Sequence, residues 1–228
     1  MVIEDINVEI VKKNIKNMHL YVLPPDGKIR ITAPYWISDK QIIDFVLSKY
    51  NWIKSQQVKM SEIPMQKKLS FVDGEKIYVW GKKYIFRFMI ADSLSISLDD
   101  NNVIFAVKDG TTTIEKERYL KEWYRTLLKD KISFYLPKWE QITGLKCSDW
   151  QTKDMKTRWG TCNTKTNKLW FSLKLAKRPV KYLEYVILHE LAHTRVPNHG
   201  SDFKTILNKH MPDWKQIQKE LNESYFYD

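Results

Sequence analysis

The fold of the C-terminal half is decided by one stretch of sequence, Tyr185-Val186-Ile187-Leu188-His189-Glu190-Leu191-Ala192-His193. Its apolar residues recur at helical spacing, so it predicts a helix that begins at Pro179 and runs to about Arg195. At 3.6 residues per turn, His189 and His193 lie one turn apart on the same face. Two imidazoles so placed can bind one cation at about 2.0–2.1 Å. Glu190, turned about 100° from His189, would lie beside that cation, where a carboxylate can hold a water molecule.

A third protein ligand has to come from outside this helix, because catalytic zinc sites usually have three protein ligands and one open position. The candidate is His199, which a continuing helix would carry about 9 Å along its axis from His193. Pro197 forces Val196 out of the α region and ends the helix, which lets His199 fold back toward the metal. Asp202 and Glu220 are the alternative third ligands. A purely structural role of the histidines, in packing or capping, is the remaining alternative.

The chain changes character near residue 110, which predicts two domains, 1–110 and 111–228. Residues 1–110 alternate at period two and predict strands, interrupted by one helix that follows a capping box at Ser38 and Gln41. Residues 111–228 predict a long helix that ends at Pro137, a short hairpin over 156–173 and further helices. We find no internal repeat in the sequence. The predicted fold class is therefore α+β, with a β-rich N-terminal region and a mainly helical C-terminal domain.

Several motifs of the chain resemble those of the YgjP-like metallopeptidase-domain family, which is related to the SprT-like and WLM zincins. The motifs are Thr157-Arg158-Trp159-Gly160-Thr161-Cys162, the helix stretch quoted above, Asn198-His199, Phe203 and Met211-Pro212-Asp213. The resemblance covers most of the chain and implies a zincin-like metal-dependent hydrolase domain. It implies one zinc ion per chain with His189, His193 and His199 as ligands. It also implies that Glu190 is the catalytic base, which activates a metal-bound water.

Two arginines are candidates for substrate binding. Arg158 lies in the predicted hairpin, and the strand before the active helix typically forms the upper rim of a zincin cleft. It could contact a carboxylate or phosphate, steady the oxyanion, or form a structural ion pair. Arg195 would place a positive charge near the cleft. The neighbouring Trp159 is expected in the core, and Gly160 is expected to allow a bulge.

The charge of the chain is unevenly distributed. The 228 residues carry a net charge of +11, and residues 138–181 hold 11 basic and 3 acidic side chains. Such a segment would attract phosphate or an acidic partner, although it could also be a solvated lysine surface.

Nothing in the sequence predicts secretion or a membrane span. Cys147 and Cys162 do not form a disulfide framework, and a lone cysteine is more often a small buried residue than a zinc ligand. No run approaches the roughly 20 apolar residues of a membrane span, and the N-terminus lacks the pattern of a secretion signal. We therefore expect a cytoplasmic protein without a membrane partner.

The leading hypothesis is a zinc-dependent hydrolase, specifically a metallopeptidase that acts on a peptide or protein. One alternative is a metal-dependent nucleoside triphosphate hydrolase that attacks a phosphoanhydride, with the basic segment 138–181 binding the phosphates. The absence of a Gly-rich phosphate loop from the sequence weakens that alternative. Another alternative is a nucleic-acid-associated SprT-like module. The surplus positive charge and the nine tryptophans favour this alternative.

Overall fold

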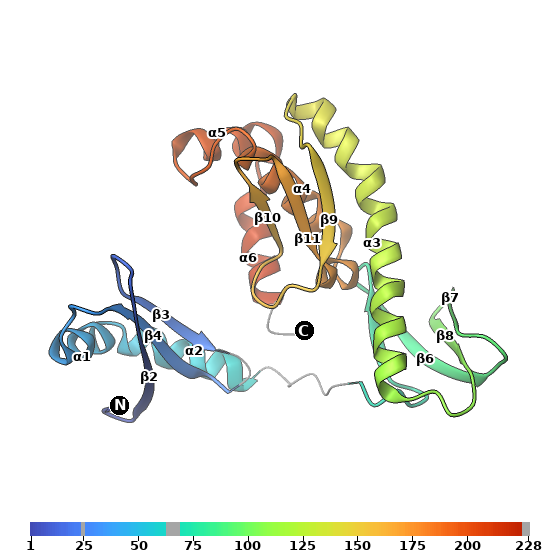
Figure 1. The fold of residues 1–228 in the computed structure, drawn as a ribbon, viewed down its shortest axis with the longest axis horizontal. Coiled ribbons are helices and arrows are strands. Elements are labelled where there is room, and N and C mark those ends of the chain that lie inside the picture. Colours follow the sequence, from blue (N-terminus) through green and yellow to red (C-terminus); the bar gives the residue numbers. More distant parts are fainter. Residues whose placement is uncertain (24–25, 63–68, 225–228) are drawn as a thin grey trace. The chain divides into compact units, whose positions relative to one another are not determined.

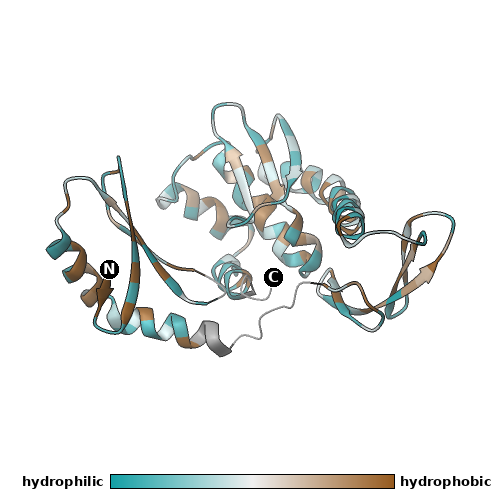
Figure 2. Cartoon of the chain, turned by 60° about the horizontal axis from the view of Figure 1, so that its bottom comes forward, coloured by the Kyte–Doolittle hydropathy of each residue, from teal (hydrophilic) through white to brown (hydrophobic). Residues whose placement is uncertain are grey.

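The computed structural model describes residues 1–23, 26–62 and 69–224. Contacts divide the chain into two compact units, Met1–Gln66 with Glu223–Asp228, and Lys67–Asn222. The change of pattern near residue 110 therefore lies inside the second unit, where it marks the passage from a sheet to a long helix. The α+β fold class is confirmed, with sheets in the N-terminal half and a mainly helical C-terminal region. Hydrophobic and hydrophilic residues alternate along the elements of both units (Figure 2).

The first unit is a four-stranded sheet with two helices (Figure 1). Its strands β1 (Val2–Ile3), β2 (Ile6–Lys13), β3 (His19–Leu23) and β4 (Lys28–Pro34) follow the order β1-β2-β4-β3, with β2 and β4 parallel. The predicted capping box is present, since the Gln41 backbone N–H donates to Ser38 Oγ at 3.3 Å. The single predicted helix is in fact two, α1 (Asp39–Ser48) and α2 (Tyr50–Glu62), which are separated at Lys49.

The second unit begins with a sheet of the same topology. Its strands β5 (Lys76–Val79), β6 (Lys82–Ile90), β7 (Ser95–Asp99) and β8 (Asn102–Val107) follow the order β5-β6-β8-β7, with β6 and β8 parallel. The first hairpin of each sheet turns through two residues, and the first of these, Glu4 or Trp80, has a positive φ near 50°. Both sheets lead into helices. The chain thus contains two four-stranded sheets of the same topology, a structural repeat that the sequence pattern did not indicate.

Helix α3 (Thr113–Thr143) continues through Pro137, so the prediction that this proline ends the helix was wrong. A proline inside a helix costs about 3 kcal/mol. Here the residues around it are anchored, because Leu136 and Trp139 are buried in the core of the second unit. The helix ends instead at Gly144, whose left-handed conformation (φ 70°) forms the C-cap.

A three-stranded sheet and the remaining helices complete the second unit. The predicted hairpin is present as the antiparallel pair β10 (Gly160–Asn163) and β11 (Lys168–Ser172). A strand that the sequence did not predict, β9 (Asp149–Lys153), runs parallel to β11 on its other side. The helices that follow are the 3₁₀ helix η1 (Leu173–Lys177), α4 (Val180–His193), α5 (Ser201–His210) and α6 (Trp214–Ser224).

The start of α4 is anchored by the tight turn between β5 and β6. The backbone N–H groups of Trp80 and Gly81 donate to the carbonyls of Ala176 and Lys177 in η1, at 2.9 and 3.2 Å. Gly81 has φ +80°, and a Cβ there would lie 2.5 Å from Cγ of Pro179. Only glycine therefore allows this turn to pack against the residue that precedes α4.

Among the described residues, no helix combines the length and the apolar character that crossing a membrane requires.

Candidate metal centre

Helix α4 places the two histidines and the glutamate of the motif. Leu183, Ile187 and Leu191 are fully buried along its back, as the spacing predicts. The helix packs against β10 and β11 on one side and against α3 and α5 on others. The motif face of α4 is thus held on a rigid element, next to strand β10.

The three predicted ligand histidines converge. His199 Nε2 lies 3.1 Å from His193 Nε2 and 3.1 Å from His189 Nε2. Two nitrogens that bind one tetrahedral zinc ion at about 2.0–2.1 Å are about 3.3 Å apart. The observed separations are close to that value, so the three imidazoles fit a single ion without rearrangement of the backbone. Within residues 1–23, 26–62 and 69–224, these histidines form the single cluster of three or more His, Cys, Asp or Glu residues that could bind a metal.

The outer nitrogens of two rings have their own partners. His193 Nδ1 lies 3.0 Å from the carbonyl oxygen of Val196. Because a carbonyl only accepts, His193 Nδ1 carries the proton and its Nε2 keeps a lone pair for a metal. His189 Nδ1 lies 3.2 Å from the hydroxyl oxygen of Tyr185, one turn earlier on α4. That contact holds the His189 ring in place, and a tyrosine hydroxyl can accept from Nδ1–H when Nε2 keeps its lone pair for a metal.

Phe203, from α5, forms a common support for the three rings. Its ring centroid lies 5.0 Å from that of His189 and 4.7 Å from those of His193 and His199. It is 1% exposed. His199, which lies beyond the end of α4, is therefore positioned by an aromatic contact as well as by its place in the chain. The sequence motif that contains Phe203 gave no indication of this contact with the histidines.

The electrostatics of the site favour neutral imidazoles. Burial, together with the neighbouring His193 and His199, lowers the pKa of His189 to about 3. Burial likewise lowers the pKa of His193. A metal binds neutral imidazole, so at neutral pH these two rings need lose no proton on metal binding. Burial also raises the pKa of Glu190 to about 8, although the positive charge of Arg158 acts in the opposite direction.

The histidines and Glu190 open into a cavity of about 480 Å³. Its walls come from β10 and the loop before it, from α4, from the segment after α4 and from α6. The lining residues that sequence reasoning did not assign to the site include Tyr185 of α4 and Gln218 and Asn222 of α6. Glutamine and asparagine on an amphipathic helix resemble solvent-facing residues in sequence, so no local pattern indicates that α6 contributes.

The structure brings only part of the predicted site together. Arg158 is exposed and lines the metal cavity, whereas Arg195 lines a separate cavity of about 500 Å³. The alternative third ligands lie elsewhere: Asp202 lines that separate cavity, and Glu220 accepts a hydrogen bond from Lys181 Nζ at 2.6 Å. Both differ from His199, whose ring points at the other two histidines.

Two further residues of the hairpin line the metal cavity. Trp159 is half-buried and packs against the core of the second unit, as expected. Cys162 is half-buried, and burial raises the pKa of its thiol to about 11. It therefore stays protonated at neutral pH.

Gly160 allows β10 to approach Glu190 closely. It pairs in register with Phe171, so it does not form a bulge in the ladder. A Cβ at this position would lie 2.7 Å from Oε1 of Glu190 and 2.8 Å from Cγ1 of Val186. Glycine is therefore required because the strand lies against the carboxylate.

The substitution Gly160→Ala is expected to lower the catalytic activity of this site by roughly 100-fold, since a displacement of about 1 Å at a reacting group has an effect of that size. Metal content should stay at the parent level, because Gly160 does not contact the histidines closely. Metal analysis and steady-state kinetics on the purified variant measure both quantities. Gly74→Ala is not a suitable control, since its φ of +85° would strain alanine. Gly200→Ala has open space around its Cβ and is the matched control. Full activity in Gly160→Ala would contradict the inference that this site needs a close approach of β10 to Glu190.

Residues 16–224 match the family described as "YgjP-like, metallopeptidase domain". The chain belongs to this family and is therefore a metallopeptidase-domain protein. The comparison with curated proteins gives no match.

Two solved structures resemble part of the chain. One is the metallopeptidase zymogen jannalysin of Methanocaldococcus jannaschii, with 22% identity and a TM-score of 0.37. The alignment covers 40% of this chain and 94% of jannalysin. The other is the metallopeptidase zymogen abylysin of Pyrococcus abyssi, with 19% identity, a TM-score of 0.37 and coverage of 40% and 90%.

Proposed function

We propose that the protein is a zinc-dependent peptidase in which His189, His193 and His199 bind the metal and Glu190 is the general base. The observation that carries the proposal is the convergence of three imidazoles, with His199 Nε2 at 3.1 Å from the Nε2 atoms of both His189 and His193, in a cavity that also contains Glu190. Three protein ligands and one open side are the arrangement of catalytic rather than structural zinc sites.

The donor set is suited to zinc. Neutral imidazoles are good ligands for Zn²⁺, and the outer-nitrogen contacts of His189 and His193 orient their rings toward a common point. When bound, zinc would supply a Lewis acid that lowers the pKa of a water molecule and polarises a carbonyl group. One ion per chain is expected, because the described part of the chain offers one such cluster.

Glu190 would handle the proton. Its carboxylate lies one residue after His189 on the cavity side of α4 and is 5% exposed. It would take the proton of the attacking water and deliver it to the nitrogen of the departing amine. A carboxyl group whose pKa is raised by burial exchanges a proton near neutral pH more readily than an exposed one. The close approach of Gly160 restricts the carboxylate to the side of α4 that faces the cavity.

Arg158 would contact substrate at the rim of the cavity. It is exposed, it lines the cavity, and its charge acts on Glu190. A guanidinium in this position can bind a carboxylate or steady negative charge that develops on a carbonyl oxygen. Arg195 has no such role in the proposal, since it lines a different cavity.

A substrate panel with and without a chelator tests the proposal. We expect cleavage of a mixed peptide library or casein, its loss on removal of metal and its recovery on addition of Zn²⁺. Nucleoside triphosphates belong in the same panel, because basic side chains near the metal cavity favour phosphoanhydride hydrolysis as the second candidate function. Metal-dependent hydrolysis of nucleotides without cleavage of any peptide would replace the proposal with that candidate.

A further inference from the structure

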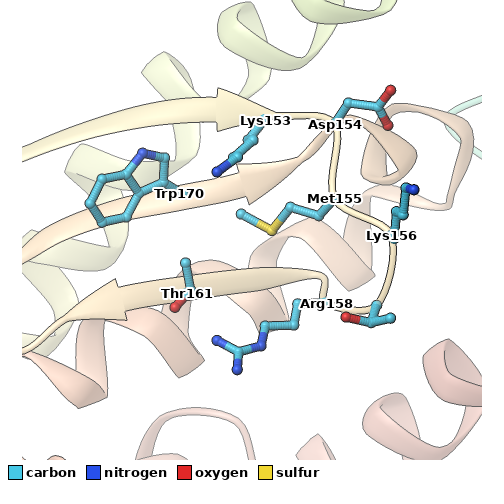
Figure 3. A pocket seen from close by; sticks show the side chains of 8 residues that line it. Lys153, Asp154, Met155, Lys156, Arg158, Thr161 and Trp170 are labelled. Atoms are coloured by element: carbon cyan, nitrogen blue, oxygen red, sulfur yellow. The ribbon is translucent and has the colours of Figure 1, made fainter.

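A second cavity, of about 430 Å³, lies beside the metal cavity and carries a concentration of positive charge (Figure 3). It is formed by the outward face of the three-stranded sheet and by the loop that joins β9 to β10. Its basic side chains are Lys153, Lys156 and Arg158. All three are exposed, and in the described part of the chain none of them forms an ion pair. Their charges are therefore available to a ligand.

The acidic residue of this cavity does not neutralise it. Asp154 Oδ2 forms an ion pair with Lys121 Nζ of α3 at 3.0 Å. In Figure 3 its carboxylate points away from the side chains of Lys153 and Met155. The cavity thus presents three cations without a neighbouring counter-charge directed into it, which attracts anionic groups.

The register of the sheet gathers the other lining groups on the same face. Thr161 pairs with Trp170, and Trp170 pairs with Gln151, two residues before Lys153. Because side chains alternate along a strand, Thr161, Trp170 and Lys153 lie on one face. The indole and the half-buried Met155 add apolar surface beside the cations. A ligand with an apolar stem and an anionic end, as in a glutamate side chain, matches this combination.

The two cavities adjoin at strand β10. Arg158 and Thr161 line both the basic cavity and the cavity that contains His189 and Glu190. Gly160 faces Glu190, whereas the next residue, Thr161, faces the basic cavity, and β10 is the edge strand of its sheet. An extended peptide directs alternate side chains to opposite faces. A peptide that lies beside β10 at the metal centre can therefore place a neighbouring side chain in the basic cavity.

We propose that this basic cavity is a substrate subsite for acidic side chains, so that the enzyme selects peptides with glutamate or aspartate near the scissile bond. Lys153, Lys156 and Arg158 bind the carboxylates, and Trp170 contacts the apolar stem. The inference rests on the proposed function, since it assigns a specificity to that peptidase.

Binding to an inactive variant tests the subsite independently of turnover. The protein is Glu190→Gln loaded with zinc. The probes are a fluorescently labelled peptide of alanine and glutamine with a central block of glutamates, and the matching peptide with glutamine in place of each glutamate. We expect the glutamate peptide to bind at least about fivefold more tightly, the factor that one favourable exposed ion pair provides. The preference should decrease with increasing salt, because exposed charges are screened.

Variants in the Glu190→Gln background assign the preference to the cavity. Adding Lys153→Gln and Lys156→Gln together should reduce it to less than about twofold, while adding Lys108→Gln, an exposed lysine far along the chain outside both cavities, should leave it unchanged. Equal binding of the two peptides, or a preference that survives the double substitution, overturns the inference. Inorganic triphosphate that binds more tightly than the glutamate peptide, through the same two lysines, would also overturn it and identify a phosphate site.

A failure of the proposed function can be distinguished from a failure of this inference. If the proposed function is wrong, the parent protein cleaves no peptide, although the binding preference for glutamate can still be measured in the inactive variant.

Discussion

Glu190→Gln is expected to lower peptide hydrolysis by about 100-fold to 10,000-fold, the range that general acid–base catalysis contributes. Glutamine has the same shape and can still hold a water molecule, but it cannot accept its proton. The zinc content should remain at the parent level, because the three histidine ligands are unchanged. Turnover of a peptide found in the substrate panel, measured together with zinc analysis of the same preparation, provides the test.

The stability of this variant separates a chemical effect from misfolding. Burial raises the pKa of Glu190 to about 8 in the folded chain, above the 4.5 of an exposed glutamate. A carboxyl group whose pKa is raised by folding binds its proton more tightly in the folded state. The free energy of unfolding therefore decreases as the pH rises between these two pKa values. Glutamine removes this loss, and the metal-free variant should be at least as stable as the parent at pH 8.

Glu184→Gln is the matched control, since it makes the same change on the same helix. Glu184 accepts a hydrogen bond from Trp139 Nε1, which glutamine can replace, and it does not line the metal cavity. Its activity should equal that of the parent. Near-parent activity in Glu190→Gln would show that another group is the base.

His199→Ala is expected to abolish turnover and to weaken zinc binding by more than the 10-fold to 100-fold effect typical of an outer-shell partner. At a zinc concentration about 1,000 times the parent's Kd, bound metal stabilises the folded state by about 4 kcal/mol. For a chain of this size, that corresponds to a melting temperature roughly 8–16 °C higher with zinc than with chelator. The variant should lose most of this difference at the same zinc concentration.

The metal-free form of this variant should remain folded, because Phe203, Leu183 and Leu191 keep the core of α4 and α5 in place. His19→Ala is the control, since His19 is exposed on β3 and belongs to the first unit. Differential scanning calorimetry with zinc and with chelator measures all three proteins. An unchanged zinc-dependent shift in His199→Ala would mean that a different residue is the third ligand.

The features that the sequence predicted correctly depend on local geometry. The placement of His189 and His193 follows from the pitch of one helix, and the capping box at Ser38 follows from a spacing of three residues. The fold back of His199 follows from the proline two residues before it. These relations involve residues close together in the chain, so the types and spacing of those residues were sufficient to predict them.

The features that the sequence missed depend on contacts between distant segments. The parallel pairing of β2 with β4, β6 with β8, and β9 with β11 joins strands whose partners no local pattern identifies. The continuation of α3 through Pro137 depends on the burial of Trp139 in the core. Similarly, the contribution of Gln218 to the metal cavity and the place of Arg195 outside it become visible only when the helices are packed.

The position of Phe203 has a consequence for the order of events during folding. The three proposed ligands, the hydroxyl of Tyr185 and the supporting ring of Phe203 all lie between residues 185 and 203. Closing so short a loop around an ion has a small entropic cost, although helix α4 itself depends on packing against the rest of the second unit. Gly160 and Gln218, by contrast, reach the cavity from β10 and α6. The proposed ligands therefore come from one short segment of the chain, whereas the cavity around them is complete only when the sheet and the last helix have packed.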